Sequence, residues 1–387
     1  MSYQTITIIK EDELDVSRVL EIIDSAKAGL IDFNSKKNDR YFQVKIKCEN
    51  DSESLLKKLQ NAGYNASIAP VKNHTQDLIE KYIITIIARS ISADQLKQTT
   101  DSITSEGLTV LSVKRLSGEH ETVSAEKTCY EVLTSGPIDL IDSVRLNLKD
   151  AGTKIGVDIC VNPHGFTRSH IRLAVFDMDS TLIQCECIDE LAKRCGIGEQ
   201  VSAITASAMR GEIDFVESFT RRMALLEGLD EFVLKDIAAN LPMTEGVVYL
   251  MKALKKLGIK TALFSGGFYY FANHLKDILD IDYVYANQLP IVDGKVTGKV
   301  AGEIVDGGKK RDKLIEIAAK EKIDLAQTVA VGDGANDLPM IKTAGMGVAF
   351  HAKPLVQKEA PCAVSTIGLD GLLYLLGISD EELNIPV

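Results

Sequence analysis

Two aspartates lie two residues apart at the end of a short apolar run. The run is Leu173–Phe176, and Asp177 and Asp179 follow it. An apolar run of this length is typical of a buried strand, in which side chains at i and i+2 point the same way. In open parallel sheets, ligands bind beyond the carboxyl ends of the strands. A buried strand gains no stability from ending in two like charges, so the pattern indicates chemistry.

Further segments of the same kind follow at other expected strand ends or at a helix start. Each is weak evidence by itself, but their order along the chain predicts one shared site. They are Ser265, Gly266 and Gly267 after 260–264, Lys310 at a helix start, and Asp333, Asn336 and Asp337 in the segment 331–337.

This set of side chains suits a phosphate ester and a magnesium ion. The three carboxylates Asp177, Asp333 and Asp337 offer the oxygen ligands that Mg²⁺ prefers. Two like charges ~4 Å apart repel by roughly 4 kcal/mol at an effective dielectric constant near 20, which disfavours a carboxylate approaching a phosphate. Mg²⁺ and the ammonium of Lys310 would cancel this repulsion.

The remaining groups fit the same chemistry. Ser265 can donate a hydrogen bond to a phosphate, and the backbone N–H groups of Gly266 and Gly267 can approach it closely. An aspartate is ionised at neutral pH and can attack phosphorus without a base. A second aspartate must then protonate the leaving alkoxide, which requires a raised pKa.

These motifs resemble the phosphatase branch of the haloacid dehalogenase superfamily from about Leu173 onward. The resemblance implies an aspartyl-phosphate intermediate and Mg²⁺. It makes Asp177 the nucleophile and Asp179 the general acid and base. Asp177, Asp333 and the backbone carbonyl of Asp179 would hold the metal, with Asp337 supporting its water shell. Ser265 and Lys310 would bind the phosphate, and Gly266 and Asn336 are also predicted to bind the substrate.

The segment after the first motif resembles the phosphoserine phosphatase family. It contains Glu186, Met209, Phe215 and Arg222 at matching positions. The resemblance implies that Glu186 meets the substrate ammonium, that Arg222 meets its carboxylate, and that Met209 and Phe215 close over it. A guanidinium fork suits a carboxylate. The implied reaction is Mg²⁺-dependent hydrolysis of O-phospho-L-serine to L-serine and phosphate, the last step of serine biosynthesis.

The elements that must position these residues form an α/β domain at 166–387. Apolar runs at 173–176, 260–264, 283–286, 328–331 and 347–349 alternate with helical segments, which predicts a doubly wound parallel sheet. The segment 186–243 shows no strand pattern and is predicted to be a helical cap inserted after the first motif.

The first 165 residues show one pattern twice. Strands are expected at 5–9, 29–33, 41–48 and 65–70, and again at 83–87, 108–116, 128–133 and 154–161. Helices are expected at 16–27 and 93–106, with a second helix in each copy ending at Ala62-Gly63 and Ala151-Gly152. The order βαββαβ is ferredoxin-like. Two tandem copies, 1–76 and 77–165, resemble ACT domains, which implies pairing into a homodimer and a possible L-serine effector site.

Composition excludes several classes of function. A net charge of −11 argues against nucleic acid or an anionic membrane as partner. The chain has no apolar run of membrane-spanning length, and its N-terminus lacks the pattern of a secretory signal. Seven irregularly spaced cysteines favour free thiols, so a cytoplasmic location is expected.

Two alternatives stay open at this point. The same first half-reaction would serve a phosphotransferase that uses another alcohol, such as homoserine, as acceptor. The tandem N-terminal modules could instead make the protein chiefly an amino-acid-sensing regulator.

Overall fold

The computed structural model describes residues 2–9, 22, 29–35, 41–48, 52–62, 64–70, 79–118, 127–137, 141–164, 170–210 and 212–383. The chain divides into two units, Met1–Asp77 and Leu78–Val387. The predicted helix at 16–27 lies outside the described residues except for position 22, and the domain boundaries predicted from the sequence stay predictions.

The first unit contains a four-stranded antiparallel sheet with strand order β2-β3-β1-β4. Helix α2 (Ser52–Asn61) buries Leu55 and Leu59. The strands are β1 (Ser2–Ile9), β2 (Gly29–Ser35), β3 (Tyr41–Cys48) and β4 (Asn65–Pro70).

The second unit opens with another four-stranded antiparallel sheet, in the equivalent order β6-β7-β5-β8. Both sheets carry a register shift at the same place, between Leu30 and Asp32 in β2 and between Val110 and Ser112 in β6. This shared irregularity supports the sequence repeat. The elements are β5 (Ile79–Ala88), α3 (Ala93–Ser105), β6 (Thr109–Arg115), β7 (Thr128–Pro137), α4 (Ile141–Ile155) and β8 (Asp158–Pro163).

The predicted end of α4 at Gly152 is wrong, because the helix continues to Ile155. Gly152 is needed for close packing instead, since a Cβ there would lie 2.6 Å from the carbonyl oxygen of Val157. The glycine beyond the helix end is Gly156, whose φ of +85° an L side chain rarely adopts. The following strand therefore begins at Asp158 and not at Lys154.

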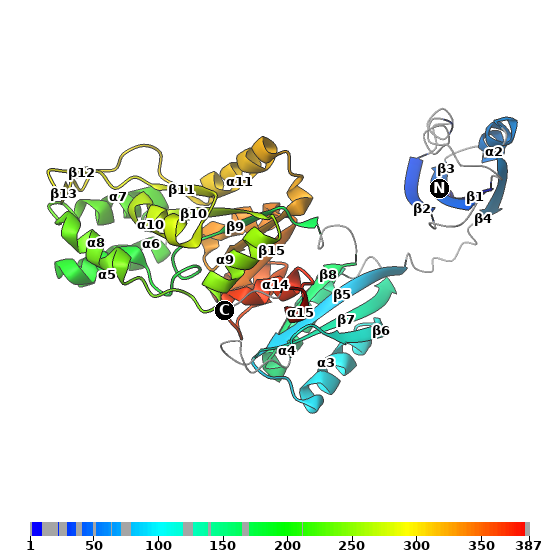
Figure 1. Ribbon diagram of the computed structural model, residues 1–387, viewed down its shortest axis with the longest axis horizontal. Helices are drawn as coiled ribbons and strands as arrows, with labels where there is room; N and C mark the ends of the chain where they lie inside the picture. The colour runs from blue at the N-terminus through cyan, green and yellow to red at the C-terminus, as the bar shows by residue number, and fades with distance from the viewer. Residues whose placement is uncertain are drawn as a thin grey trace. The chain divides into compact units, whose positions relative to one another are not determined.

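A six-stranded parallel sheet forms the centre of the rest of the chain, which confirms the predicted α/β class (Figure 1). Its order is β11-β10-β9-β14-β15-β16, so the direction of strand addition reverses at β9. The strands are β9 (Leu173–Phe176), β10 (Lys260–Phe268), β11 (Tyr283–Asn287), β14 (Thr328–Gly332), β15 (Met346–Phe350) and β16 (Cys362–Val364).

Both faces of this sheet are covered by apolar side chains. In β9, Ala174 and Phe176 belong to one buried cluster, and Leu173 and Val175 belong to another. Alternate residues of a strand point to opposite faces, so a continuous apolar run is what a doubly covered strand requires. The helices that supply these clusters include α9 (Val247–Lys256), α10 (Tyr269–Leu279), α11 (Gly307–Glu321), α12 (Leu338–Thr343), α13 (Pro354–Glu359) and α14 (Leu372–Leu375).

Four helices fill the segment between the first motif and residue 240. They are α5 (Cys187–Cys195), α6 (Gly198–Met209), α7 (Phe215–Ala224) and α8 (Glu231–Ala239), and they gather at one end of the parallel sheet in Figure 1. The small hairpin of β12 (Ile291–Val292) and β13 (Lys295–Val296) and the short α15 (Asp380–Leu383) complete the α-helices and strands assigned among the described residues.

Candidate active site

The predicted motifs meet at the carboxyl edge of the parallel sheet. Strand β9 lies between β10 and β14, so residues at or just beyond the carboxyl ends of these three strands converge where the strand order reverses. Asp177 and Asp179 follow β9, Asp333 follows β14, and Ser265 lies within β10. The backbone N–H of Asp177 donates to the carbonyl oxygen of Val331, which ties the first motif to β14.

Three carboxylates form a buried cluster at this edge. One carboxylate oxygen from each of Asp177, Asp333 and Asp337 lies within 4.8 Å of the others, and none of the three side chains has more than slight exposure. Exclusively oxygen donors at this spacing fit a hard divalent cation such as Mg²⁺. The cluster therefore has the donor set that a metal site requires.

Lys310 lies fully buried among these carboxylates. Its Nζ is 2.7 Å from Oδ1 of Asp177 and 2.7 Å from Oδ1 of Asp337. Burial by itself would lower the pKa of Lys310, but Asp177 and Asp337 outweigh it and raise the pKa above its usual value. Lys310 therefore keeps its charge and neutralises part of the cluster.

The aspartates of the first motif are also strongly perturbed. Burial, followed by the charge of Asp337, raises the pKa of Asp177 well above its ordinary value, although Lys310 opposes the shift. Burial and the neighbouring Glu186 raise the pKa of Asp179 to about 7. Burial and Asp337 raise the pKa of Asp333 to about 6. Asp179 has a pKa near neutral pH, and Asp177 next to it is paired with the ammonium of Lys310. This difference suits Asp179 as the acid and Asp177 as the nucleophile.

Close backbone packing around Asp179 depends on glycine. A Cβ on Gly267 would lie 2.8 Å from Oδ2 of Asp179 and 3.0 Å from Oγ of Ser265. The backbone N–H of Gly267 donates to Ser265 Oγ over 2.8 Å. The carbonyl of Gly266 accepts a hydrogen bond from the side chain of Asn287, the last residue of the neighbouring strand β11.

A cavity of about 650 Å³ opens over this cluster and is lined by residues of both the sheet edge and the inserted helices. Asp177, Asp179 and Asp333 lie at its sheet side, and Gly266 and Asn336 also line it. Glu186, Phe215 and Arg222 come from the inserted segment. Met209 is the last residue of α6, but its side chain lies outside the described part of the chain.

Glu186 and Arg222, the charged residues predicted from the inserted segment, have few internal partners. Arg222 is half-buried, and its Nε donates to the carbonyl of Ser218 on the preceding turn over 3.3 Å. Among the residues the structure describes, no carboxylate lies within ion-pair distance of Arg222. Glu186 accepts a hydrogen bond from the Ser180 hydroxyl over 3.0 Å. Both groups keep hydrogen-bonding capacity for a ligand in the cavity.

Two charged residues that line the cavity were not predicted from the sequence. Lys353 follows β15, and its backbone N–H donates to the carbonyl oxygen of Asp333 over 3.1 Å. The rule that selected the other motifs, polar residues after a strand, also applies to Lys353. Asp189 lies one helical turn beyond Glu186 and faces the same cavity; only its i+3 spacing from Glu186 could have indicated it.

None of the helices in the described portion is both long and apolar enough to cross a lipid bilayer.

Comparison with known proteins agrees with the geometry. The haloacid dehalogenase-like hydrolase family matches residues 171–345. A phosphoserine phosphatase of Streptomyces coelicolor is 41% identical over 302 residues, which are 78% of this chain and 72% of that protein.

Solved structures give the same result. A probable phosphoserine phosphatase of Vibrio cholerae is 34% identical with a TM-score of 0.61, covering 76% of this chain and 86% of that one. A phosphoserine phosphatase solved as a phospho-aspartyl intermediate analogue is 41% identical with a TM-score of 0.50, over 53% of this chain and 98% of that one. The chain therefore belongs to the phosphoserine phosphatase family of haloacid dehalogenase-like hydrolases.

Proposed function

We propose that this protein hydrolyses O-phospho-L-serine to L-serine and phosphate, with Mg²⁺ as cofactor and Asp177 as the phosphorylated residue. The observation that carries the proposal is the buried cluster of Asp177, Asp333, Asp337 and Lys310 beneath a cavity that also presents Glu186 and Arg222. The relatives named above carry the same activity in their names.

The metal-binding residues in this proposal are Asp177, Asp333 and the backbone carbonyl of Asp179, with Asp337 supporting the water shell. A bound Mg²⁺ would supply positive charge that lets an anionic phosphate approach anionic carboxylates. Lys310 would add a fixed ammonium next to the nucleophile. Ser265, Gly266 and Asn336 would hold the phosphate oxygens.

The chemistry divides into two half-reactions at Asp177. A carboxylate oxygen of Asp177 bonds to phosphorus while the bond from phosphorus to the serine oxygen breaks, and Asp179 gives that oxygen its proton. Asp179 then takes a proton from water, the water oxygen bonds to phosphorus, and the bond to Asp177 breaks. A pKa of about 7 lets Asp179 serve in both directions near neutral pH.

Substrate choice would come from the inserted helices. Arg222 would bind the substrate carboxylate and Glu186 its ammonium, while Phe215 and Met209 would close over the carbon atoms. Phe215 is 36% exposed, which leaves its ring available for contact. Burial lowers the pKa of Arg222, an effect that nearby carboxylates only partly oppose. Binding a carboxylate would therefore relieve an uncompensated charge.

The test is the release of phosphate from a panel of phosphorylated metabolites by the full chain, with and without Mg²⁺. Phosphoserine should be the best substrate, chelation should stop the reaction, and Asp177→Asn should reduce turnover by at least about 10³-fold. Serine and phosphate should appear in equal amounts even when homoserine is added. Substantial turnover by Asp177→Asn, or loss of phosphate to an acceptor alcohol, would contradict the proposal.

The N-terminal 165 residues complete the proposal as two ACT-like domains, 1–76 and 77–165, that pair into a homodimer and offer a possible L-serine effector site. Support comes from the shared strand order and register shift. Strand β6 is an edge strand with Leu111 and Val113 nearly half exposed, which suits pairing between copies. Calorimetric titration of the full chain with L-serine tests the effector site, and light scattering tests the dimer.

A cytoplasmic location is part of the same proposal. Every cysteine that the structure describes is a free thiol, which fits a reducing compartment.

A further inference from the structure

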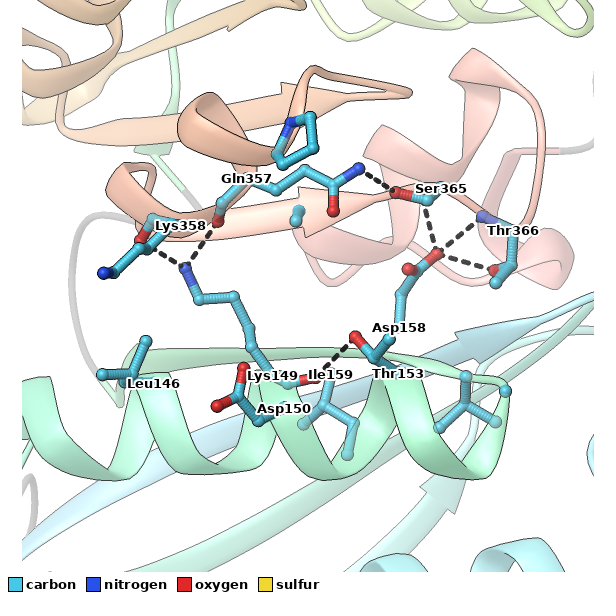
Figure 2. A pocket seen from close by; sticks show the side chains of 14 residues that line it. Leu146, Lys149, Asp150, Thr153, Asp158, Ile159, Gln357, Lys358, Ser365 and Thr366 are labelled. Carbon is cyan, nitrogen blue, oxygen red and sulfur yellow. Dashed lines mark hydrogen bonds between the residues drawn. The ribbon is translucent and has the colours of Figure 1, made fainter.

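The second antiparallel sheet and the parallel sheet are joined by charged side chains of α4 and β8. Lys149 of α4 and Asp158 of β8 both reach the segment 357–366 of the parallel-sheet domain (Figure 2). They line a cavity of about 600 Å³ at this junction, separate from the active-site cavity.

Lys149 holds the carboxyl end of α13. Its Nζ donates to the carbonyl oxygens of Gln357 at 3.0 Å, Lys358 at 3.3 Å and Ala360 at 2.6 Å. The last carbonyls of a helix have no partner within it, and a cation there also interacts favourably with the helix dipole. Burial lowers the pKa of Lys149. The three carbonyl oxygens accept one hydrogen bond each from its ammonium group. The contact therefore anchors α13.

Asp158 holds the chain just beyond β16. Its Oδ2 accepts hydrogen bonds from the backbone N–H groups of Ser365 and Thr366, each at 2.8 Å, and from the Thr366 hydroxyl at 2.7 Å. The segment from α13 through β16 is thus fixed at two places by the domain that contains β5–β8.

The opposite end of α13 lies at the active site. Lys353 is its N-cap residue and lines the active-site cavity, and its N–H donates to the carbonyl oxygen of Asp333. Nε2 of Gln357 donates to the carbonyl of Ala352, which precedes the N-cap, over 2.7 Å, and Val356 of the helix is fully buried. A helix of six residues is about 9 Å long, so α13 is a short connection between the contacts of Lys149 and the contact with Asp333.

From this arrangement we propose that Lys149 is a positioning residue for the metal site, acting through α13 on Asp333. The inference rests on the proposed function only in naming Mg²⁺ as the metal. Loss of the Lys149 ammonium frees the carboxyl end of α13, loosens the contact from Lys353 to Asp333, and weakens metal binding at a site that Lys149 never touches.

The test compares Mg²⁺ binding by full-length wild type and Lys149→Met, which keeps most of the aliphatic stem and removes the charge. Isothermal calorimetry in the absence of substrate gives the dissociation constant directly. We expect it to rise about three- to tenfold, less than the loss seen when a residue directly bonded to a metal ligand is removed. The Mg²⁺ concentration for half-maximal phosphatase activity should rise by the same factor.

Lys154→Met is the matched control, because Lys154 lies on the same helix and is exposed to solvent. It should leave Mg²⁺ affinity unchanged, whereas Lys149→Arg, which keeps a donor and a charge, should recover most of the wild-type affinity. If Lys149→Met does not fold, Lys149→Gln serves in its place and should weaken Mg²⁺ binding in the same direction.

A merely structural role gives a different result. Lower thermal stability of the Lys149 variants with Mg²⁺ affinity within twofold of wild type would overturn the inference, as would wild type that binds no Mg²⁺. Wild type that binds Mg²⁺ but does not hydrolyse phosphoserine would contradict the proposed function alone, and the shift in affinity would still support the role of Lys149.

Discussion

Replacing Lys310 by methionine tests whether its ammonium stabilises the buried carboxylates of the site, and the test needs no substrate. The variant keeps most of the apolar stem but leaves the carboxylates of Asp177 and Asp337 buried without the ammonium that lies 2.7 Å from each. Removing one partner from a buried ion pair typically costs 3–5 kcal/mol, because the remaining charge has no compensation. In metal-free buffer at pH 8 we therefore expect Lys310→Met to lose about 3–5 kcal/mol of unfolding free energy.

The loss should depend on pH in a defined direction. The pKa of Asp177 is already raised in the folded protein, and Lys310 is one of the groups that limits the shift. Without Lys310 this pKa rises further above its unfolded value, so the variant loses stability as pH increases through the folded pKa. The difference in stability between variant and wild type should therefore be largest at pH 8 and shrink toward pH 5, where protonation removes the buried charge.

Thermal unfolding followed by fluorescence or calorimetry at pH 5 and pH 8 measures both effects. The stability loss corresponds to a fall in Tm of roughly 10 °C for a domain of this size. Lys309→Met is the matched control, because Lys309 is adjacent in sequence but forms an exposed ion pair with Glu303, and it should shift Tm by about 1–2 °C or less. Equal shifts for the two variants, or a deficit that grows toward pH 5, would refute the electrostatic reasoning.

Three other predictions concern activity. Arg222→Ala should raise KM for phosphoserine about 10- to 100-fold, the effect of losing a charged hydrogen bond, while KM for an aryl phosphate changes little; equal changes would remove Arg222 from carboxylate recognition. Gly267→Ala places a methyl group 2.8 Å from the carboxylate of Asp179 and should lower kcat at least about tenfold with little change in Tm. Gly198→Ala, which meets nothing within 4 Å, is its control. Because the pKa of Asp179 is about 7 and the first step needs its proton, kcat/KM for phosphoserine should fall as pH rises above 7. An aryl phosphate, which needs no proton on its leaving group, should lack this alkaline limb.

The positions of the motifs were predictable because the physics behind them is local. An apolar run covered on both faces must be continuous, and Leu173–Phe176 is. Parallel strands bring their carboxyl ends to one edge, so residues at the carboxyl ends of β9, β10 and β14 had to meet. The helical character of 186–243 followed from the absence of strand patterns, and four helices are present there.

Other features depend on contacts that no local pattern contains. The predicted end of α4 was wrong because the sequence cannot distinguish Gly152 from Gly156. Only the fold does so: Gly152 packs closely against Val157, and Gly156 has a positive φ. Strand β16 is three residues long and takes its place from pairing with β15. Such short elements carry too little sequence signal to be found in isolation.

Lys310 and Lys149 differ in the same way: local sequence indicates the role of the first, and only the folded structure indicates the role of the second. Lys310 could be predicted because it lies at the start of a helix and because its place in the order of the motifs along the chain fits the shared site. The structure places it there, with ion pairs to Asp177 and Asp337. Lys149 has no motif and lies on a helix of a different sheet, yet it donates to three carbonyl oxygens of a helix whose other end contacts Asp333. Its partners are backbone carbonyl oxygens more than two hundred positions away. Every residue has such a group, so the residue types in the sequence do not indicate these contacts. A residue of this kind can be recognised only in the folded chain, and through it the domain that contains β5–β8 helps to position Asp333.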